Sequence, residues 1–238
     1  MTYSIAARCP RTGQFGLAVT TSSIAVGPRC AFARPGIGAV LTQHQTDPRL
    51  GPMGLALLEE GLPAAEVIER LTTSGDPHIQ RRQLAVVDRN GRTGVFHGDK
   101  IWSVHGEART DGAIAIANIV RNADVPAAMI AAFDERPEEP LAERLVAALE
   151  AGKAAGGEWK QEKSAALLVV EAETFPLVDL RVDYDPRAID QLRFLWDTYR
   201  PMVEMYVARA LAPDTPLAGF TPPPGSAPKP TPTPTPAT

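Results

Sequence analysis

The sequence predicts an α+β protein in which two antiparallel sheets are covered by helices. Hairpin turns join many of the expected strands, and strands and helices do not alternate regularly, which argues against a doubly wound parallel sheet. Two segments, residues 84–87 and 166–170, are almost continuously apolar, as is typical of strands buried on both faces. The expected order is three strands, two helices, four strands, two helices, two strands and one helix.

The first half of the chain begins with a predicted hairpin. Residues 2–8 and 15–21 are rich in β-branched and apolar residues, and the segment from Pro10 to Gly13 between them has the composition and length of a turn. Asn90-Gly91 marks another hairpin, because both residues tolerate a positive φ. The spacing of apolar residues predicts the other elements of this half: strands at 37–43, 83–88 and 93–97, and helices at 51–60 and 63–73.

Helix-capping residues organise the second half. Asp124 is a plausible N-cap, Gly152 ends a helix, and Asp185-Pro186 opens the final helix. The expected elements are strands at 101–105, 113–119, 165–170 and 177–182, and helices at 124–133 and 141–149. Residues 222–238 alternate Pro with Thr, Ala, Gly and Lys and lack the apolar surface that would offset the entropy of ordering. We therefore expect a domain at 1–220 and a disordered Pro/Thr-rich tail at 221–238.

Composition and charge narrow the class of protein. The chain of 238 residues is 44% hydrophobic and 22% charged, close to an average globular protein. Its net charge is −4 without long runs of one sign, so no nucleic-acid surface is expected. No stretch is long and apolar enough to span a membrane, and the N-terminus lacks the pattern of a signal peptide. We expect a cytoplasmic protein with no membrane association.

The histidines and cysteines form no recognised metal or nucleophile motif. His97, Asp99 and His105 remain an alternative metal site at strand ends, but ordinary surface histidines fit the pattern better. Cys9 lies at a strand end with no evident base, and Cys30 fits a small apolar packing residue. We expect neither a metal nor a cofactor.

Thr2 is the strongest candidate for a catalytic residue. A small residue at position two normally permits removal of Met1, which leaves Thr2 with a hydroxyl and a free α-amine. An α-amine titrates near pH 7.7–8.0, and it can therefore act as the base for the hydroxyl of the same residue. Because many ordinary proteins also begin with Met-Thr, this pattern alone does not establish catalysis.

Hydroxyl and amide side chains are concentrated at the ends of the expected strands. Thr20 and Ser22 end the second strand, which in a hairpin lies beside Thr2. Thr42 and Gln43 end the third strand and precede a polar loop. These residues are candidates for binding substrate or an oxyanion. A role in capping strands and bonding loop backbone fits them equally well.

Two arginines near the hairpin are further candidates. Arg29 and Arg34 would keep the α-amine neutral and stabilise a developing oxyanion. Each arginine fits a solvated loop charge equally well.

Several segments share the pattern of one family. They are TYSIAAR at 2–8, TGQFGLAV at 12–19, AVG at 25–27, GIGAV at 36–40 with TQ at 42–43, DP at 47–48, GPMGL at 51–55, RQLAVVD at 82–88, residues 141–157, SAALLVV at 164–170 and VDLRV at 178–182. Over residues 2–200 the chain resembles the bacterial domain-of-unknown-function 1028 family of N-terminal-nucleophile (Ntn) hydrolases.

The resemblance implies an Ntn-hydrolase-like αββα four-layer sandwich with Thr2 as the nucleophile. Two departures from the family pattern concern the substrate pocket. The segment before Asn118, itself a candidate for contact with substrate, is less polar than expected, and Lys163 stands where a Gln is expected.

These observations lead to an amidohydrolase that cleaves a small amide or peptide-like C–N bond. A ligand-binding protein that keeps the sandwich without the chemistry is the alternative. Self-processing has no support, because no peptide precedes Met1. A homodimer is the default expectation, because sheet edges and apolar helix faces are exposed.

Overall fold

The N-terminal hairpin forms the centre of a six-stranded antiparallel sheet in the computed structural model, which describes residues 1–214. β1 (Thr2–Arg8) pairs with β2 (Phe15–Thr21) on one side and with β8 (Ala113–Asn118) on the other, and the full strand order is β10-β9-β2-β1-β8-β7. The second sheet has four strands in the order β3-β4-β5-β6. In chain order the other elements are α1 (Gly27–Cys30), β3 (Ala31–Arg34), β4 (Gly38–His44), α2 (Leu50–Glu59), α3 (Ala64–Thr72), η1 (Ile79–Arg81), β5 (Arg82–Asp88), β6 (Thr93–His97), β7 (His105–Thr110), α4 (Val125–Asp134), α5 (Leu141–Ala154), β9 (Ser164–Val170), β10 (Val178–Val182), α6 (Ala188–Tyr199), η2 (Arg200–Met202) and α7 (Val203–Leu211).

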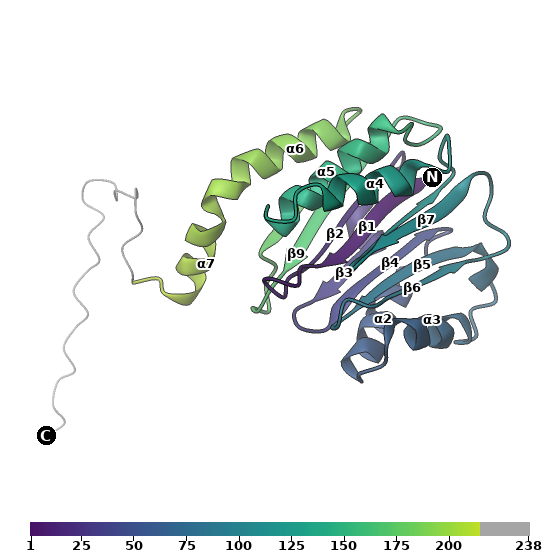
Figure 1. The fold of residues 1–238 in the computed structure, drawn as a ribbon, viewed down its shortest axis with the longest axis horizontal. Helices are drawn as coiled ribbons and strands as arrows, with labels where there is room; N and C mark the ends of the chain where they lie inside the picture. The colour runs from purple at the N-terminus through teal and green to yellow at the C-terminus, as the bar shows by residue number, and fades with distance from the viewer. Residues whose placement is uncertain (215–238) are drawn as a thin grey trace, which may run out of the picture. The chain divides into compact units, whose positions relative to one another are not determined.

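The two sheets pack face to face and helices cover their outer faces, which gives four layers (Figure 1). Helices α4, α5 and α6 pack on the six-stranded sheet, and α2 and α3 pack on the four-stranded sheet. The expected αββα architecture is therefore confirmed. This arrangement belongs to a compact unit formed by Met1–Pro201; a second unit begins at Met202 and contains α7.

Alternation along the strands divides the core into layers. An apolar cluster lies between the two sheets, with Leu17, Leu41 and Ile116 among its members, and another lies under α2 and α3 around Val40, Leu84 and Val86.

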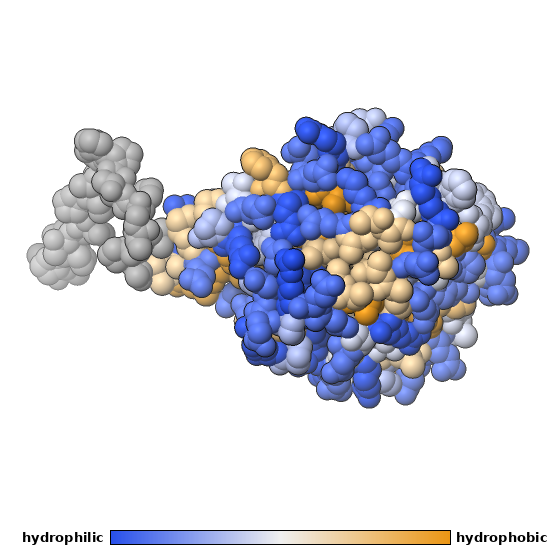
Figure 2. Space-filling model, turned by 45° about the horizontal axis from the view of Figure 1, so that its top comes forward, coloured by the Kyte–Doolittle hydropathy of each residue, from blue (hydrophilic) through white to orange (hydrophobic). Residues whose placement is uncertain are grey.

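The face of the molecule in Figure 2 is mostly hydrophilic, with a patch of apolar residues among the polar ones. None of the helices within residues 1–214 has the length and apolarity needed to cross a bilayer.

Tyr3 of β1 points to the helix layer, where it approaches Gly152 of α5 closely. A Cβ at position 152 would lie 2.9 Å from Tyr3 Cε2, so glycine is required for this contact. Because Tyr3 faces the helices, its neighbours Thr2 and Ser4 face the opposite sheet. Ser4 Oγ donates to Gln43 Oε1 of β4 at 2.8 Å across the gap.

Several boundaries differ from the sequence expectation. The short strand β3 and the one-turn helix α1 before it were not expected, and the strand expected at 101–105 is wrong because β7 begins at His105. β7 is an edge strand whose residues alternate between exposed and half-buried, so its sequence lacks an apolar stripe. The last helix of the compact unit begins at Ala188, later than expected, because Asp185 Oδ1 accepts from the Arg187 N–H at 2.6 Å in a turn before it.

The division at 220 and the tail at 221–238 stay predictions, since residues 215–238 lie outside the described part of the chain.

Candidate active site

Thr2 occupies the first position of β1 and is 5% exposed. Its hydroxyl donates to the Met1 carbonyl oxygen, and the Thr21 hydroxyl donates to the same oxygen at 2.5 Å. The two hydroxyl oxygens lie 3.5 Å apart. The hairpin register places Tyr3 opposite Thr20, which brings Thr2 and Thr21 together at the ends of β1 and β2. The Met1 carbonyl is therefore held by two threonine hydroxyls.

A buried carboxylate lies close to this cluster. Glu158 Oε2 accepts from the Ser22 N–H at 2.9 Å, and its Oε1 is buried without a partner among residues 1–214. Burial raises the pKa of Glu158 to about 7, although the nearby positive α-amine acts to lower it. Burial also lowers the pKa of the Met1 α-amine, against the opposing charges of Glu158 and Cys30. Burial therefore disfavours the charged form of both groups.

A second carboxylate supports the first. Glu162 Oε1 accepts from the Glu158 backbone N–H at 3.1 Å and from the Tyr3 hydroxyl at 3.1 Å. Tyr3 follows Thr2 directly, so this contact ties the start of β1 to the segment that carries Glu158.

The structure brings three of the sequence-predicted residues to the Thr2 end of the sandwich. Ser22 Oγ lies 3.8 Å from Met1 Sδ, and Asn118 is opposite Thr2 in the register of β1 and β8. Gln43 faces the gap between the sheets, but its Oε1 accepts from Ser4, and its Nε2 donates to Gln83 Oε1 at 2.6 Å and to the Ile116 carbonyl at 3.5 Å. The polar atoms of Gln43 are thus occupied by protein partners.

The other three predicted residues lie away from Thr2. Thr20 is on the opposite face of β2, where its hydroxyl donates to the Ser164 carbonyl at 2.8 Å. Thr42 is on the opposite face of β4 from Gln43, and its hydroxyl donates to the Asp47 carbonyl at 3.3 Å. Arg34 forms a 2.5 Å ion pair with Glu59 at the far end of β4, about 17 Å along the strand from Gln43.

Arg29 is also tied to its own loop. Its guanidinium donates to the Ala25 carbonyl at 3.0 Å, to the Ser23 hydroxyl at 3.0 Å and to the Ile24 carbonyl at 2.6 Å.

A network of buried amides crosses from the four-stranded sheet to Asn118. Gln83 Oε1 accepts from Asn118 Nδ2 at 2.9 Å as well as from Gln43. Gln83 Nε2 donates to the Ala117 carbonyl at 2.9 Å and lies 2.8 Å from His97 Nδ1. His97 Nε2 lies 2.8 Å from Glu107 Oε2. The polar interior next to Thr2 is thus connected to a histidine and a carboxylate on β6 and β7.

His97 and His105 approach each other, with ring centroids 5.6 Å apart. Within residues 1–214, however, no three His, Cys, Asp or Glu side chains are gathered as a metal site requires.

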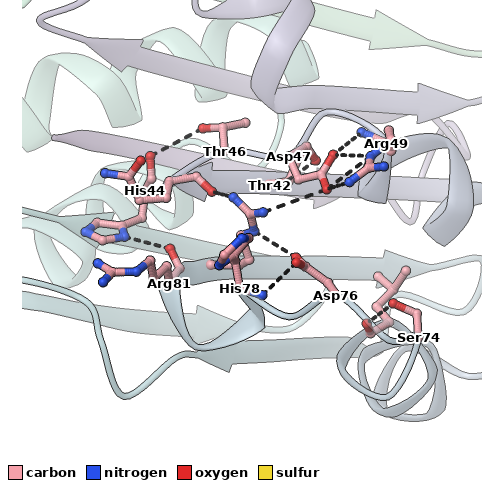
Figure 3. A network of polar contacts seen from close by, with 12 residues as sticks. Thr42, His44, Thr46, Asp47, Arg49, Ser74, Asp76, His78 and Arg81 are labelled. Carbon is pink, nitrogen blue, oxygen red and sulfur yellow. Dashed lines mark hydrogen bonds and ion pairs between the residues drawn. The ribbon is translucent and has the colours of Figure 1, made fainter.

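An ion-pair cluster connects the loop that follows β4 with the loop that precedes β5 (Figure 3). Arg82 donates to Asp76 Oδ2 at 2.9 Å and lies 3.9 Å from Asp47 Oδ2. The Asp47 carboxylate is also held by Arg49 at 2.7 Å, and this hydrogen bond lowers the pKa of Asp47. His44 Nδ1 lies 2.7 Å from the Arg81 carbonyl in the same region. These contacts hold the ends of β4 and β5 in place.

The loops at the Thr2 end contain strained backbone. The non-glycine residues with positive φ among residues 1–214 are Ala25, His44, Ser103 and Ile119, with φ of 53°, 71°, 63° and 53°. Ala25 and Ile119 follow β2 and β8, His44 is the last residue of β4, and Ser103 precedes β7, all at the end of the sandwich where β1 begins. Such conformations cost about 1–3 kcal/mol each and cluster at functional sites.

The residues near Thr2 that the sequence interpretation passed over are Thr21, Gln83, Glu158 and Glu162. Thr21 had a usable signal, because the register of the predicted hairpin pairs position 2 with position 21. Glu158 and Glu162 follow a glycine-rich stretch whose sequence has no helix or strand pattern. Gln83 reaches the site only through the packing of the two sheets.

Comparisons with known proteins agree with this description. The family model described as "Family of unknown function (DUF1028)" matches residues 2–192. The crystal structure of a Silicibacter pomeroyi protein from the same family is similar, with 31% sequence identity, a TM-score of 0.77, and coverage of 83% of this chain and 85% of that one. A search among curated proteins found no match.

Two further solved structures are much more remote. Anbu (ancestral beta-subunit) from Yersinia bercovieri has 13% identity and a TM-score of 0.36, over 86% of this chain and 96% of its own. An Anbu mutant from Hyphomicrobium sp. strain MC1 has 14% identity and a TM-score of 0.42, over 86% and 97%. These likenesses are too distant to carry an argument. On the family match and the Silicibacter pomeroyi structure, the chain belongs to the DUF1028 family.

Proposed function

We propose that the protein is a hydrolase of small amide or peptide-like C–N bonds, with Thr2 as its nucleophile after removal of Met1. The observation that carries the proposal is the position of Thr2 and Thr21, whose hydroxyls both donate to the Met1 carbonyl oxygen. Loss of Met1 would free both hydroxyls and create an α-amine on the residue that bears one of them. Nucleophile, base and an adjacent hydrogen-bond donor would then lie together at a shielded position.

The proposed reaction uses the Thr2 amine twice. The neutral α-amine accepts the proton of Thr2 Oγ1 as this oxygen bonds to the substrate carbonyl carbon, and the C=O pair moves to the oxygen. When the intermediate collapses, the C–N bond breaks and the ammonium gives its proton to the leaving nitrogen. The amine then takes a proton from water as the water oxygen attacks the acyl ester carbon. The second intermediate collapses, the bond between the acyl carbon and Thr2 Oγ1 breaks, and the ammonium gives its proton to Thr2 Oγ1 as the acid is released.

The neighbours of Thr2 have separate roles in this scheme. Thr21, whose hydroxyl already donates to a carbonyl at 2.5 Å, is the candidate donor to the oxyanion, with Ser22 beside it. Thr2 is buried, and burial disfavours the charged form of an amine and so favours the neutral form that the first step requires. The nearby Glu158 carboxylate would balance the ammonium that forms.

The test uses p-nitrophenyl acetate, an activated ester with a small acyl group. We expect Thr2→Ala to lower hydrolysis by about 10³-fold or more, to the background rate, and Thr2→Ser to retain activity because hydroxyl and amine both survive. An N-terminal extension that is not removed should be as damaging as Thr2→Ala, because it blocks the amine. Thr12→Ala, in an exposed turn, is the matched control. Equal hydrolysis by wild type and Thr2→Ala would favour the non-catalytic ligand-binding alternative.

A further inference from the structure

Asn118 has one buried polar atom without a partner. Its Nδ2 donates to Gln83 Oε1 at 2.9 Å, whereas its Oδ1 is buried and meets no donor among residues 1–214. Asn118 itself is 0% exposed. A buried acceptor without a hydrogen bond is destabilising, so a donor is expected to approach this atom in the functional state.

The direction of the Asn118 amide is set by its neighbours. Gln83 Nε2 donates to the Ala117 carbonyl, so Gln83 must present its Oε1 to Asn118 and Gln43. His97 strengthens this orientation, because its Nδ1 lies 2.8 Å from Gln83 Nε2 and can accept the second N–H. Asn118 can then meet Gln83 only through Nδ2, which leaves Oδ1 as the free atom.

The tautomer of His97 agrees with this direction. With Nδ1 as acceptor, the proton of the neutral ring is on Nε2, where it donates to Glu107 Oε2 at 2.8 Å. The groups that face His97 are Gln83 from β5 and Glu107, His105 and Arg109 from β7. Burial lowers the pKa of His97 and outweighs the opposing effect of Glu107, which keeps Nδ1 free to accept.

Asn118 is also the residue opposite Thr2. Directly opposed residues of an antiparallel pair have Cβ atoms about 4.5–5.5 Å apart, and Thr2 and Asn118 are such a pair. With Met1 in place, the Thr2 nitrogen is a peptide N–H. Once Thr2 is the first residue, the same nitrogen becomes a rotatable amine with two donors, or three when protonated.

We propose that Gln83 and His97 are positioning residues, which hold Asn118 so that its Oδ1 accepts a hydrogen bond from the α-amine of Thr2. This inference rests on the proposed function and adds the element that orients its base. An N–H directed at Oδ1 restricts rotation about the Thr2 N–Cα bond and leaves the lone pair free for the Thr2 hydroxyl. Asn118 presents an acceptor to Thr2, so it does not serve as an oxyanion donor.

The experiment measures the pKa of the Thr2 α-amine by ¹⁵N NMR, using threonine-labelled chain released from a cleavable N-terminal fusion so that Thr2 is its first residue. An acceptor bonded to the ammonium raises the pKa of the amine. Asn118→Leu removes this acceptor and should lower the pKa of the Thr2 amine by about one pH unit. Gln83→Leu should lower it in the same direction, because Asn118 loses its fixed orientation. We expect His97→Leu to lower the pKa, because Gln83 Nε2 loses its acceptor, and His97→Gln, which keeps an acceptor, to leave the pKa close to that of wild type. An unchanged pKa in His97→Leu would overturn the role of His97.

Leu41→Ala, in the apolar part of the same inter-sheet space, controls for destabilisation and should leave the amine pKa unchanged. Gln83→Met, close in shape to glutamine, replaces Gln83→Leu if circular dichroism shows that the latter does not fold. An unchanged pKa in Asn118→Leu would overturn the acceptor role, and an unchanged pKa in the folded Gln83 variant would overturn the positioning role of Gln83. Neither result depends on turnover. Hydrolysis of p-nitrophenyl acetate by the same samples tests the proposed function separately.

Discussion

The two ends of the space between the sheets are built from the same strands but with opposite chemistry. β1, β4, β5 and β8 each place an apolar residue at one end and, two residues along on the same face, a polar residue at the Thr2 end. The pairs are Ala6 and Ser4, Leu41 and Gln43, Ala85 and Gln83, and Ile116 and Asn118. The apolar end gains stability from burial. Buried donors and acceptors at the polar end need hydrogen-bond partners, and among residues 1–214 Asn118 Oδ1 and Glu158 Oε1 have none.

The backbone shows the same contrast. At the apolar end, left-handed positions in the hairpin turns are occupied by glycines, including Gly13, Gly91 and Gly112. At the Thr2 end, residues with side chains such as His44 and Ile119 adopt this conformation, although Gly156 and Gly157 also occur there. Glycine removes the steric cost of a positive φ. The Thr2 end therefore keeps strain that the other end avoids, which is the pattern expected where function competes with stability.

The largest expected effect is the loss of hydrolysis in Thr2→Ala without a loss of folding stability. Thr2→Ala should remove ester hydrolysis, as described above, while its free energy of unfolding stays within about 1 kcal/mol of wild type, since the lost side chain is small and lies next to the chain terminus. Urea denaturation followed by circular dichroism measures the second quantity. A large loss of stability in Thr2→Ala would mean that Thr2 is a structural residue.

Substitutions at Leu41 and Gln43, which lie two residues apart on β4, allow the apolar end and the polar end to be compared within one strand. Leu41→Ala should cost about 2–5 kcal/mol, because it removes buried methyl groups and leaves a cavity. Gln43→Ala should cost about 1–3 kcal/mol, because it leaves the Ser4 hydroxyl and part of the Gln83 amide without partners. Denaturation curves give both values. Unchanged stability with a large loss of turnover in Gln43→Ala would instead place Gln43 in contact with substrate.

Glu158 should make stability depend on pH while Met1 is in place. Its folded pKa of about 7 lies above the ordinary value of 4.5, so the folded state binds this proton more tightly than the unfolded state. The resulting stability is present below pH 4.5 and is lost as pH rises to about 7. The Glu158→Gln variant lacks this dependence. As pH rises from 4.5 to about 7, its free energy of unfolding should therefore increase relative to that of wild type by up to about 3 kcal/mol. Exposed Glu60→Gln is the control, and an equal pH profile for wild type and Glu158→Gln would contradict the assignment.

The smallest expected effect concerns backbone strain. Ser103 is exposed and has a φ of 63°, so Ser103→Gly should stabilise the protein by about 0.5–1 kcal/mol, offset in part by the greater freedom of glycine in the unfolded chain. Ser103→Ala keeps the Cβ and should bring no gain. Thermal unfolding of the two variants measures the difference, and equal midpoints would show that Ser103 is not strained.

Much of the fold followed from the sequence, because its signals are local. Turn residues and strand alternation predicted the N-terminal hairpin and the Asn90-Gly91 hairpin, and the family resemblance and the four-layer sandwich are confirmed. β3 and β7 were missed or misplaced because one is four residues long and the other is a polar edge strand.

The candidate site was less accessible to sequence reasoning. Thr20 and Thr42 were chosen for their residue type, but a shift of one position along a strand turns a side chain to the opposite face. Thr21 has the required parity and was available from the hairpin register. The contact of Gln83 with Asn118 joins residues 35 positions apart on different sheets, and it arises only when the sheets are packed. The contact of Gln83 with His97 joins paired residues of β5 and β6, so it was available from the register of the Asn90-Gly91 hairpin.

The most direct test of the account is to find the acyl group that Thr2 should carry. Wild-type protein is mixed briefly with p-nitrophenyl acetate, quenched in acid and analysed by intact and tandem mass spectrometry. We expect a chain that lacks Met1, begins at Thr2 and carries one acetyl group on the Thr2 oxygen, as an ester that hydroxylamine removes. A chain that retains Met1, or acetylation confined to residues other than Thr2, would contradict the account.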